Sequence, residues 1–434
     1  MTLTPVAAAS VVESDEYLPE RRRQGIGLCL SGGGFRATLF HLGALRRLHE
    51  LGVLARVRTI SSVSGGSLMA LVLADALRKA GKLSDFEREV AAPTHALASS
   101  NLRKHMVRRR LNPLNWIRGR EFVDHMAALL EADVTSMRLG ELPESPSFVF
   151  CATDMAFGVN WIFTRERMGD YQIGYQSPPP DEYPAARAAA ASACFPPLFN
   201  PLRTHFRERD FKKGKITDRA LRERCIGGLR LTDGGTYDNM GLEPVWKDHA
   251  YVLVSDGGGP FEFTPDRGLK WRLFRYADIV QNQARALRRR WLIASFTTDD
   301  PDTGRHVLDG TYWAVSSARA RYVKGDTAGY SKRLARDVIA NVRTDLDAFS
   351  DAERCVLENH GYFLADIALR RHVPDLMPPS DPPLRPPHPE WLDEKEVENH
   401  INTPQHKDSK EKLGKVENKG TGSSVAKVWH DSFS

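Results

Sequence analysis

The sequence is poor in cysteine and lacks any long apolar run. Its five cysteines are scattered over 434 residues, and no two of them form a CxxC pair. This spacing indicates neither a disulfide framework nor a cysteine zinc site, and it favours a reducing compartment. The longest apolar helix candidate, SLMALVLADAL, is too short to cross a bilayer and contains Asp75.

A secretory signal is also missing from the first 24 residues, where no basic segment precedes a long apolar stretch. We therefore expect a cytoplasmic protein; a chain of this kind that acted on lipids would have to bind a membrane surface rather than cross the bilayer. The hydrophobic fraction of 41% is typical of a globular chain, and the net charge of +6 favours acidic partners only mildly.

The composition divides the chain into three parts. Residues 1–24 form an N-terminal leader, and residues 25–373 form one folded domain. After Val373 the sequence is first rich in proline and then polar and charged. Such a segment buries too little apolar surface to fold alone, so we expect a disordered tail over 374–434.

Strand and helix patterns alternate from residue 25 onward. GIGLCL is followed by a helix over 35–51, and VRTISSVS by the helical run GGSLMALVLADALRKAG. This order predicts an α/β fold with a mostly parallel central sheet flanked by helices. Further strands are expected at SFVFCAT, GVNWIFT, LRLTDGG and AYVLVSDGGG, and further helices at RYADIVQNQARALRRRWL and ERCVLENHGYFLADIAL.

Three consecutive glycines, Gly32, Gly33 and Gly34, separate the first strand from the first helix. Such a loop presents backbone N–H groups to an anion. A nucleotide-binding P-loop would continue with Lys and then Ser or Thr, but Phe35 and Arg36 follow instead. The next strand ends in TISSVSGG without the carboxylate that would bind a dinucleotide ribose. We therefore expect neither ATP or GTP at a P-loop nor a dinucleotide such as NAD.

The second strand leads into Ser62-Val63-Ser64-Gly65-Gly66, where a nucleophile elbow belongs. Gly66 supplies the small residue needed after the nucleophile, and Ser62 stands where glycine is usual. This position predicts that Ser64 lies beside the glycine loop at the carboxyl edge of the sheet. The amides of Gly33 and Gly34 would then stabilise the oxyanion formed when Ser64 attacks an ester.

A serine nucleophile needs a base. Asp233 ends a predicted strand and is followed by Gly234 and Gly235, which permit a sharp turn and leave the carboxylate accessible at the same sheet edge. Burial would raise its pKa and make it a better base. A second copy of the pattern ends in Asp256, but its strand is more hydrophobic, so we favour Asp233 as the base and Asp256 as a turn brace.

The glycine loop, the serine elbow and the later Asp-Gly-Gly, in this order, resemble the patatin-like phospholipase family over residues 25–373. The stretch AAAASACFPPLFNPL also resembles that family. The resemblance implies a Ser64–Asp233 dyad without histidine, and an acyl-enzyme formed from a phospholipid or lysophospholipid. It implies an oxyanion loop of Gly32, Gly33, Gly34 and Arg36, with motif support from Gly65, Gly66, Gly234 and Gly235. No metal is expected, because the sequence contains neither an HExxH motif nor an EF-hand loop, and no cofactor is expected. Arg36 would hold a substrate phosphate or pair with a nearby acid.

Other interpretations remain open at this stage. Ser64 could be a helix N-cap and Asp233 a turn residue. A hydrolase with a conventional triad would use a histidine, for which His360 and His41 are the candidates. The substrate could be a small ester or a thioester, the acyl group could pass to an alcohol, or the chain could bind lipid without turnover.

The segment Asn101–Arg120 contains seven basic residues and no acidic one, with leucines and a tryptophan between them. We predict that this helical insertion contacts an anionic membrane surface, with a solvated face as the alternative. The run RALRRRW at 285–291 has the same character. The sequence contains no nucleic-acid-binding module, so no nucleic acid is expected.

Overall fold

The computed structural model describes residues 24–401 apart from 103, 105–121, 197–198, 262–264, 267 and 300–305. Its strands are β1 (Ile26–Leu30), β2 (Val57–Val63), β3 (Ser147–Asp154), β4 (Val159–Phe163), β5 (Met168–Asp170), β6 (Gly174–Gln176), β7 (Leu202–Arg203), β8 (Arg230–Asp233), β9 (Tyr251–Asp256) and β10 (Asp309–Ala314). Its helices are α1 (Gly34–Glu50), α2 (Gly65–Ala80), α3 (Ala92–Ser99), α6 (Phe122–Asp133), α7 (Ala185–Ser192), α8 (Arg219–Gly227), α9 (Gly235–Asp238), α10 (Leu269–Ser295), α11 (Lys332–Asp337), α12 (Asp351–His372) and α13 (Glu394–Ile401).

The strands form one mixed sheet in the order β10-β9-β1-β2-β3-β4-β5-β6. The neighbours from β10 to β3 are parallel, whereas β4, β5 and β6 continue as an antiparallel extension. β8 pairs antiparallel with β3, and β7 pairs with β8. The predicted α/β fold with a mostly parallel sheet flanked by helices is therefore confirmed.

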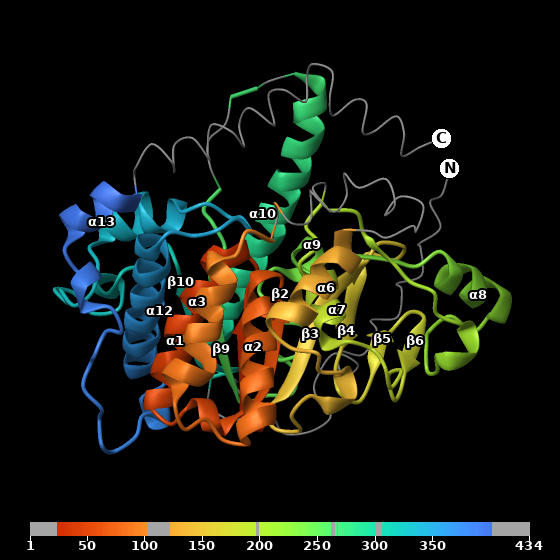
Figure 1. The fold of residues 1–434 in the computed structure, drawn as a ribbon, viewed down its shortest axis with the longest axis horizontal. Helices are drawn as coiled ribbons and strands as arrows, with labels where there is room; N and C mark the ends of the chain where they lie inside the picture. Colours follow the sequence, from red (N-terminus) through yellow and green to blue (C-terminus); the bar gives the residue numbers. More distant parts are fainter. Residues whose placement is uncertain are drawn as a thin grey trace, which may run out of the picture.

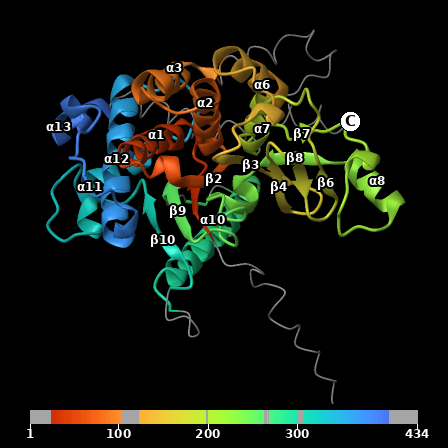
Figure 2. The ribbon, with the colours of Figure 1, turned by 90° about the horizontal axis from the view of Figure 1, so that it is seen from below.

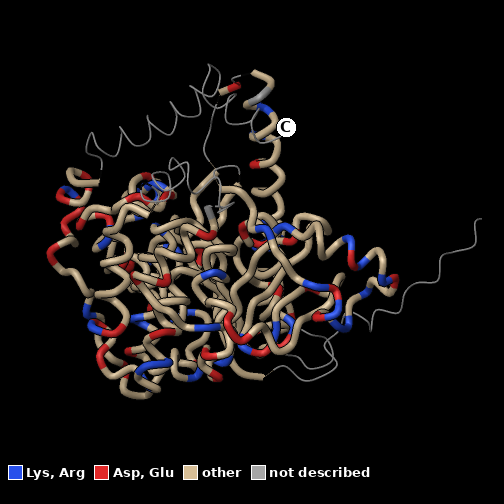
Figure 3. The backbone as a smooth tube through the Cα atoms, turned by 45° about the vertical axis from the view of Figure 1, so that its right-hand side comes forward, with Lys and Arg blue, Asp and Glu red and all other residues tan. Residues whose placement is uncertain are grey.

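Helices cover both faces of the sheet (Figures 1 and 2). α1, α2, α7 and α12 lie on one face, and α10 lies on the other (Figure 2). The larger core is formed by buried aliphatic and aromatic side chains of the sheet and of the helices on the face that carries α1 and α12. A smaller core on the opposite face contains Cys29, Val252 and Val254 with Leu292 of α10. Charged residues of both signs are interspersed over the body of the molecule (Figure 3).

The structure differs from the expected tail over residues 374–401, which pack against the domain. Arg47 donates hydrogen bonds to the carbonyls of Pro382 (2.7 Å) and Pro383 (3.3 Å), and Val397 and Ile401 are buried. A proline-rich segment lacks amide donors, but its free carbonyls can be ordered by side-chain donors of a neighbouring helix. Residues 402–434, the leader over 1–23 and most of the basic insertion lie outside the described residues.

The six predicted strands match β1, β2, β3, β4, β8 and β9, whereas the short β5, β6 and β7 and the edge strand β10 have no predicted counterpart. The sequence of β10, DGTYWA, begins with two residues that are rare in strands, and it joins the parallel edge beside β9. None of the described helices combines the length and the apolar composition needed to cross a bilayer.

Candidate active site

Ser64 lies in the sharp turn between β2 and α2. Its backbone has φ 53° and ψ −119°, which is rare for a residue other than glycine. A strained conformation of this kind costs about 1–3 kcal/mol and persists only where the surroundings hold it. Ser64 has 9% relative exposure, whereas its neighbours in β2 are fully buried. This is the geometry of a nucleophile elbow.

Ser192, at the end of α7, holds this turn from behind. Its hydroxyl accepts a hydrogen bond from the Ser64 amide (3.0 Å), donates to the Cys151 carbonyl (2.6 Å), and lies 2.8 Å from the Ser67 hydroxyl. Its own carbonyl accepts the amide of Gly234, directly after Asp233. Sequence reasoning missed this residue, and the only signal was its place in the small-residue stretch AAAASACFPPLFNPL.

The glycine loop packs directly against the elbow. A Cβ atom added to Gly65 would lie 2.1 Å from the Gly34 carbonyl oxygen, so only glycine permits this approach. The loop itself turns through positive φ angles of 145° at Gly33 and 58° at Gly34. The glycine loop and the turn that carries Ser64 are therefore in contact through their backbones, at Gly34 and Gly65.

The amides of the three glycines are not equivalent. The Gly32 N–H donates to the Asn239 carbonyl (3.0 Å), whereas the described residues provide no acceptor for the N–H groups of Gly33 and Gly34. These two amides at the start of α1 can therefore receive negative charge, and the Gly32 amide cannot without losing its bond. The structure thus restricts the candidate oxyanion donors to Gly33 and Gly34.

Asp233 reaches Ser64 because β2 and β8 meet end to end. Both strands pair with β3, one parallel and one antiparallel, so they run toward each other. Val63 is opposite Cys151, and Asp233 is opposite the next residue, Ala152. The sequence predicted two strand ends at one edge of a parallel sheet, whereas the antiparallel β8 brings the carboxylate down onto the elbow.

The Asp233 carboxyl is buried rather than accessible, with 1% exposure. Its Oδ1 accepts the amide of Gly235 (2.7 Å), and its Oδ2 has no hydrogen-bond partner among the described residues. Burial raises the pKa of Asp233 to about 7, although the Gly235 amide and the nearby Ser64 hydroxyl act in the opposite direction. A carboxyl with this pKa can both take and return a proton near neutral pH.

Asp256 has the opposite environment. Arg285 forms an ion pair with it at 2.7 Å, and the Tyr312 hydroxyl donates to it at 2.6 Å. Burial acts to raise the pKa of Asp256, but the charge of Arg285 and these hydrogen bonds outweigh it and lower the pKa. The carboxylate is therefore a stable anion that braces the loop after β9.

Arg36 donates hydrogen bonds to backbone carbonyls of two loops far from it in the sequence. Its Nε donates to the Gly257 carbonyl (3.0 Å) and its Nη1 to the Val342 carbonyl (2.7 Å). The side chain is buried, with 4% exposure. These bonds tie the start of α1 to two distant loops, so Arg36 supports the position of the glycine loop.

The two candidate histidines form hydrogen bonds to groups other than Ser64 and Asp233. His41 contacts the Ser255 hydroxyl (2.8 Å) and the Ser31 carbonyl (2.9 Å), and His360 contacts the Val315 carbonyl (2.8 Å). Burial lowers the pKa of each to about 4. Both rings are therefore neutral groups of the core, which is the behaviour of structural histidines.

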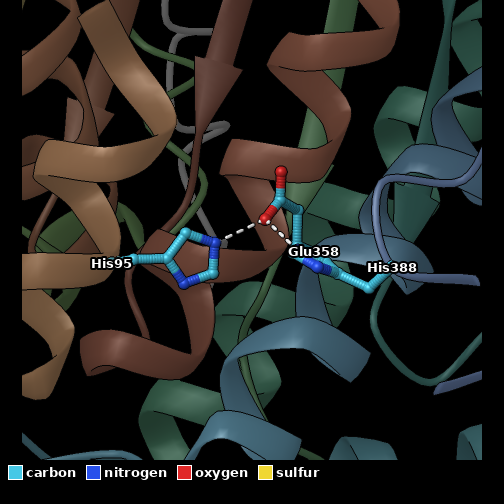
Figure 4. A group of neighbouring side chains, drawn as sticks. All are labelled: His95, Glu358 and His388. Atoms are coloured by element: carbon cyan, nitrogen blue, oxygen red, sulfur yellow. Dashed lines mark hydrogen bonds and ion pairs between the residues drawn. The ribbon is translucent and has the colours of Figure 1, made fainter. Parts of the chain in front are cut away.

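Two overlapping groups of described residues have the composition of a metal site; both contain His388, which the second combines with Cys355 and Glu390. His95, Glu358 and His388 come from α3, α12 and the segment after it, and both histidines contact Glu358 Oε2, at 2.6 and 2.8 Å (Figure 4). The second carboxylate oxygen pairs with Arg46 at 2.7 Å. Since the guanidinium already neutralises this buried carboxylate and repels a cation, the contacts are explained by an ion cluster that ties α3 and residue 388 to α12.

Replacing Ser192 with alanine tests its role behind the elbow. The variant leaves the Ser64 amide without its acceptor, so we expect kcat to fall about 10- to 100-fold with little change in KM, because a displacement of about 1 Å can cost 100-fold. Ester hydrolysis measures this. Ser67→Ala is the matched control, since Ser67 contacts Ser192 but not the Ser64 amide; equal losses in both variants would contradict a specific effect on the nucleophile.

The chain is similar to a known protein family and to solved structures. A family model described as patatin-like phospholipase matches residues 28–246. Human GIVD cytosolic phospholipase A2, solved with a methyl gamma-linolenyl fluorophosphonate inhibitor and terbium chloride, is similar at 15% identity and a TM-score of 0.46, over 79% of this chain and 58% of that chain. VipD from Legionella pneumophila is similar at 15% identity and a TM-score of 0.34, over 81% and 67%. The chain thus spans less than two thirds of the human enzyme's length. A search of curated protein sequences gave no match.

Proposed function

Because this chain belongs to the patatin-like phospholipase family, we propose that it is a serine acyl hydrolase that cleaves fatty acyl esters of phospholipids or lysophospholipids. The observation that carries this proposal is a buried carboxyl beside the strained elbow, where the Ser64 hydroxyl acts on the pKa of Asp233. Ser64 and Asp233 stand at opposing strand ends, and the glycine loop that carries the Gly33 and Gly34 amides packs against the elbow.

The mechanism needs only these groups. Asp233 takes the hydroxyl proton of Ser64 while the Ser64 oxygen attacks the ester carbonyl. The developing negative charge is stabilised by the Gly33 and Gly34 amides, and each donor of this kind is worth about 3 kcal/mol in the transition state. The leaving alcohol departs with the proton from Asp233, and an acyl-enzyme remains. Asp233 then deprotonates water, which releases the fatty acid and restores Ser64.

Labelling and a substrate panel test the proposal. A fluorophosphonate probe should label Ser64, and the chain should release fatty acid from phosphatidylcholine or lysophosphatidylcholine faster than it cleaves short p-nitrophenyl esters. Higher rates on short esters or thioesters would favour an esterase, and product transfer to added alcohols would favour an acyltransferase. Lipid binding without labelling or turnover would identify a non-catalytic lipid-binding protein and reject the proposal.

The pH dependence of hydrolysis should follow the ionisation of Asp233. A general base acts only when deprotonated, so a pKa of about 7 predicts that kcat/KM rises about tenfold per pH unit below pH 7 and levels above it. Initial rates on a soluble ester between pH 5 and pH 9 measure the profile. A plateau that extends down to pH 5 would contradict a base with a raised pKa.

His360→Gln distinguishes the dyad from a triad. Glutamine retains a donor that can reach the Val315 carbonyl, and the ring lies in the core rather than on Ser64. We expect kcat to remain within about twofold of the wild type, because the dyad uses no histidine, whereas loss of a catalytic base costs orders of magnitude. Melting temperature controls for folding. If the His360→Gln enzyme were folded but inactive, a triad that includes His360 would be favoured over the dyad.

A further inference from the structure

Helix α10 rises from the body of the molecule beside α9 (Figure 1), the short helix that starts two residues after Asp233. Its C-terminal half is firmly anchored. Leu292 is fully buried in the smaller core, Arg285 pairs with Asp256, and Gln281 Nε2 donates to the Gly235 carbonyl at 2.8 Å. Since Gly235 also donates its amide to Asp233, the helix is fixed to the turn that carries the candidate base.

The N-terminal half of α10 has a very different environment. Large apolar side chains are exposed along it, in a pattern that follows one helical face. This apolar stripe consists of Leu269, Leu273, Tyr276 and Val280 and continues to Leu287 beyond the midpoint of the helix; each of the five is between 60% and 74% exposed. The spacings of 4, 3, 4 and 7 residues keep all five within a narrow sector of a helix with 3.6 residues per turn. Phe274 and Ile279 are also exposed beside the stripe.

The charges of α10 match an anionic surface. Both signs are interspersed over the body (Figure 3). Arg285 and Arg272 of this helix pair with Asp256 and Asp266, but its sequence contains one acidic residue, Asp278, against a lysine and six arginines. Three of these, Arg288, Arg289 and Arg290, follow each other directly after the stripe. An apolar face combined with basic residues is the composition of helices that lie in the interface of an anionic bilayer.

We propose that the apolar stripe of α10 inserts into an anionic lipid bilayer and brings the Ser64–Asp233 site to its substrate. The proposal rests on the acyl-hydrolase function for its purpose, but membrane binding itself can be measured without turnover. The N-terminal part of the helix, from Leu269 to Val280, is about 18 Å long at 1.5 Å per residue. It ends next to Gln281, whose side chain donates to the Gly235 carbonyl in the turn after Asp233. Insertion would therefore place lipid next to the elbow.

This surface is distinct from the basic insertion predicted from the sequence. That segment lies mostly outside the described residues, whereas α10 is described over its full length. The sequence suggested only the cluster RALRRRW within α10. The apolar stripe lies mainly on the N-terminal side of that cluster. Only the folded chain shows that the stripe is exposed, because the same sequence pattern on a buried helix would face the hydrophobic core.

The test compares vesicle binding with two kinds of hydrolysis. The variant L273Q/V280Q removes the centre of the stripe with residues that favour helix. Leu221→Gln on α8 is the matched control, because it removes an exposed leucine elsewhere. Cosedimentation uses vesicles of phosphatidylcholine alone or mixed with phosphatidylglycerol, and hydrolysis is measured on the same vesicles and on water-soluble p-nitrophenyl butyrate. Circular dichroism confirms folding.

We expect wild type and Leu221→Gln to bind mixed vesicles equally, and more tightly than phosphatidylcholine vesicles. L273Q/V280Q should bind mixed vesicles at least tenfold more weakly, since each lost apolar side chain contributes roughly a factor of 10. Its hydrolysis of vesicle lipid should fall in proportion, while its kcat/KM on p-nitrophenyl butyrate stays at the wild-type value.

Three results would overturn the proposal. The variant could bind mixed vesicles as tightly as wild type, its soluble-ester activity could fall in parallel with binding, or light scattering could show a dimer that dissociates in L273Q/V280Q and binds no vesicles. The third result would identify a second copy of the chain as the occupant. If the wild type binds vesicles through the stripe but hydrolyses neither substrate, the proposed acyl-hydrolase function is rejected and the membrane-binding role of α10 is retained.

Discussion

Ser64→Ala is expected to lower kcat/KM for fatty acyl ester hydrolysis by at least about 10⁴-fold, because removal of a nucleophile leaves only binding and oxyanion stabilisation. The Ser64 backbone is already held at φ 53° by its neighbours, and alanine differs only by the missing hydroxyl. The variant should therefore fold normally and keep its affinity for lipid. Initial rates on lysophosphatidylcholine, with fluorophosphonate labelling of the same preparations, measure the effect.

Ser295→Ala is the matched control for this substitution. Its hydroxyl donates to the Trp291 carbonyl within α10, so its removal should leave the rate unchanged and the melting temperature nearly so. Residual activity above about 1% in a folded Ser64→Ala protein, or probe labelling at another residue, would show that the nucleophile lies elsewhere.

Asp233→Asn is expected to have two effects of opposite sign. Hydrolysis should fall by about 10⁴-fold, because an amide cannot accept the Ser64 proton. The protein should at the same time become more stable at neutral and alkaline pH. The amide oxygen can still accept the Gly235 N–H, and the buried negative charge is gone.

The pH dependence of this stabilisation follows from the Asp233 pKa. The folded-state pKa of about 7 lies above the ordinary value of 3.8, so the folded state binds the proton more tightly than the unfolded chain. The wild type therefore loses stability as pH rises from about 4 to 7, and this loss persists above pH 7. The advantage of Asp233→Asn in free energy of unfolding should grow by about 2–3 kcal/mol between pH 5 and pH 8, at 1.36 kcal/mol per pH unit.

Asp256→Asn is the control, because it changes the second copy of the motif. The pKa of Asp256 is lowered, and its removal leaves the buried Arg285 without its counter-charge. This variant should lose about 3 kcal/mol of stability at pH 8, where Asp233→Asn gains. Denaturant unfolding at both pH values separates the two. If Asp233→Asn were destabilised like Asp256→Asn, Asp233 would be an ion-paired structural residue and not the base.

The sequence by itself determined the elements whose requirements are local. Three glycines before a helix, a serine in a strand-to-helix turn and the alternation of strand and helix are each set by a few neighbouring residues. The candidate nucleophile Ser64 and the loop beside it could therefore be predicted, as could the mostly parallel sheet. Their contact follows from the close approach of Gly65 to Gly34.

Only the tertiary structure decided what each charged or polar side chain faces. Asp233 and Asp256 have nearly the same local motif, but one is buried against Ser64 and the other is paired with Arg285. Arg36 binds carbonyls from loops more than 200 positions away in the chain, and Ser192 reaches the elbow from α7. Burial, pKa and hydrogen-bond partners depend on contacts between distant segments, and a local sequence pattern does not contain them.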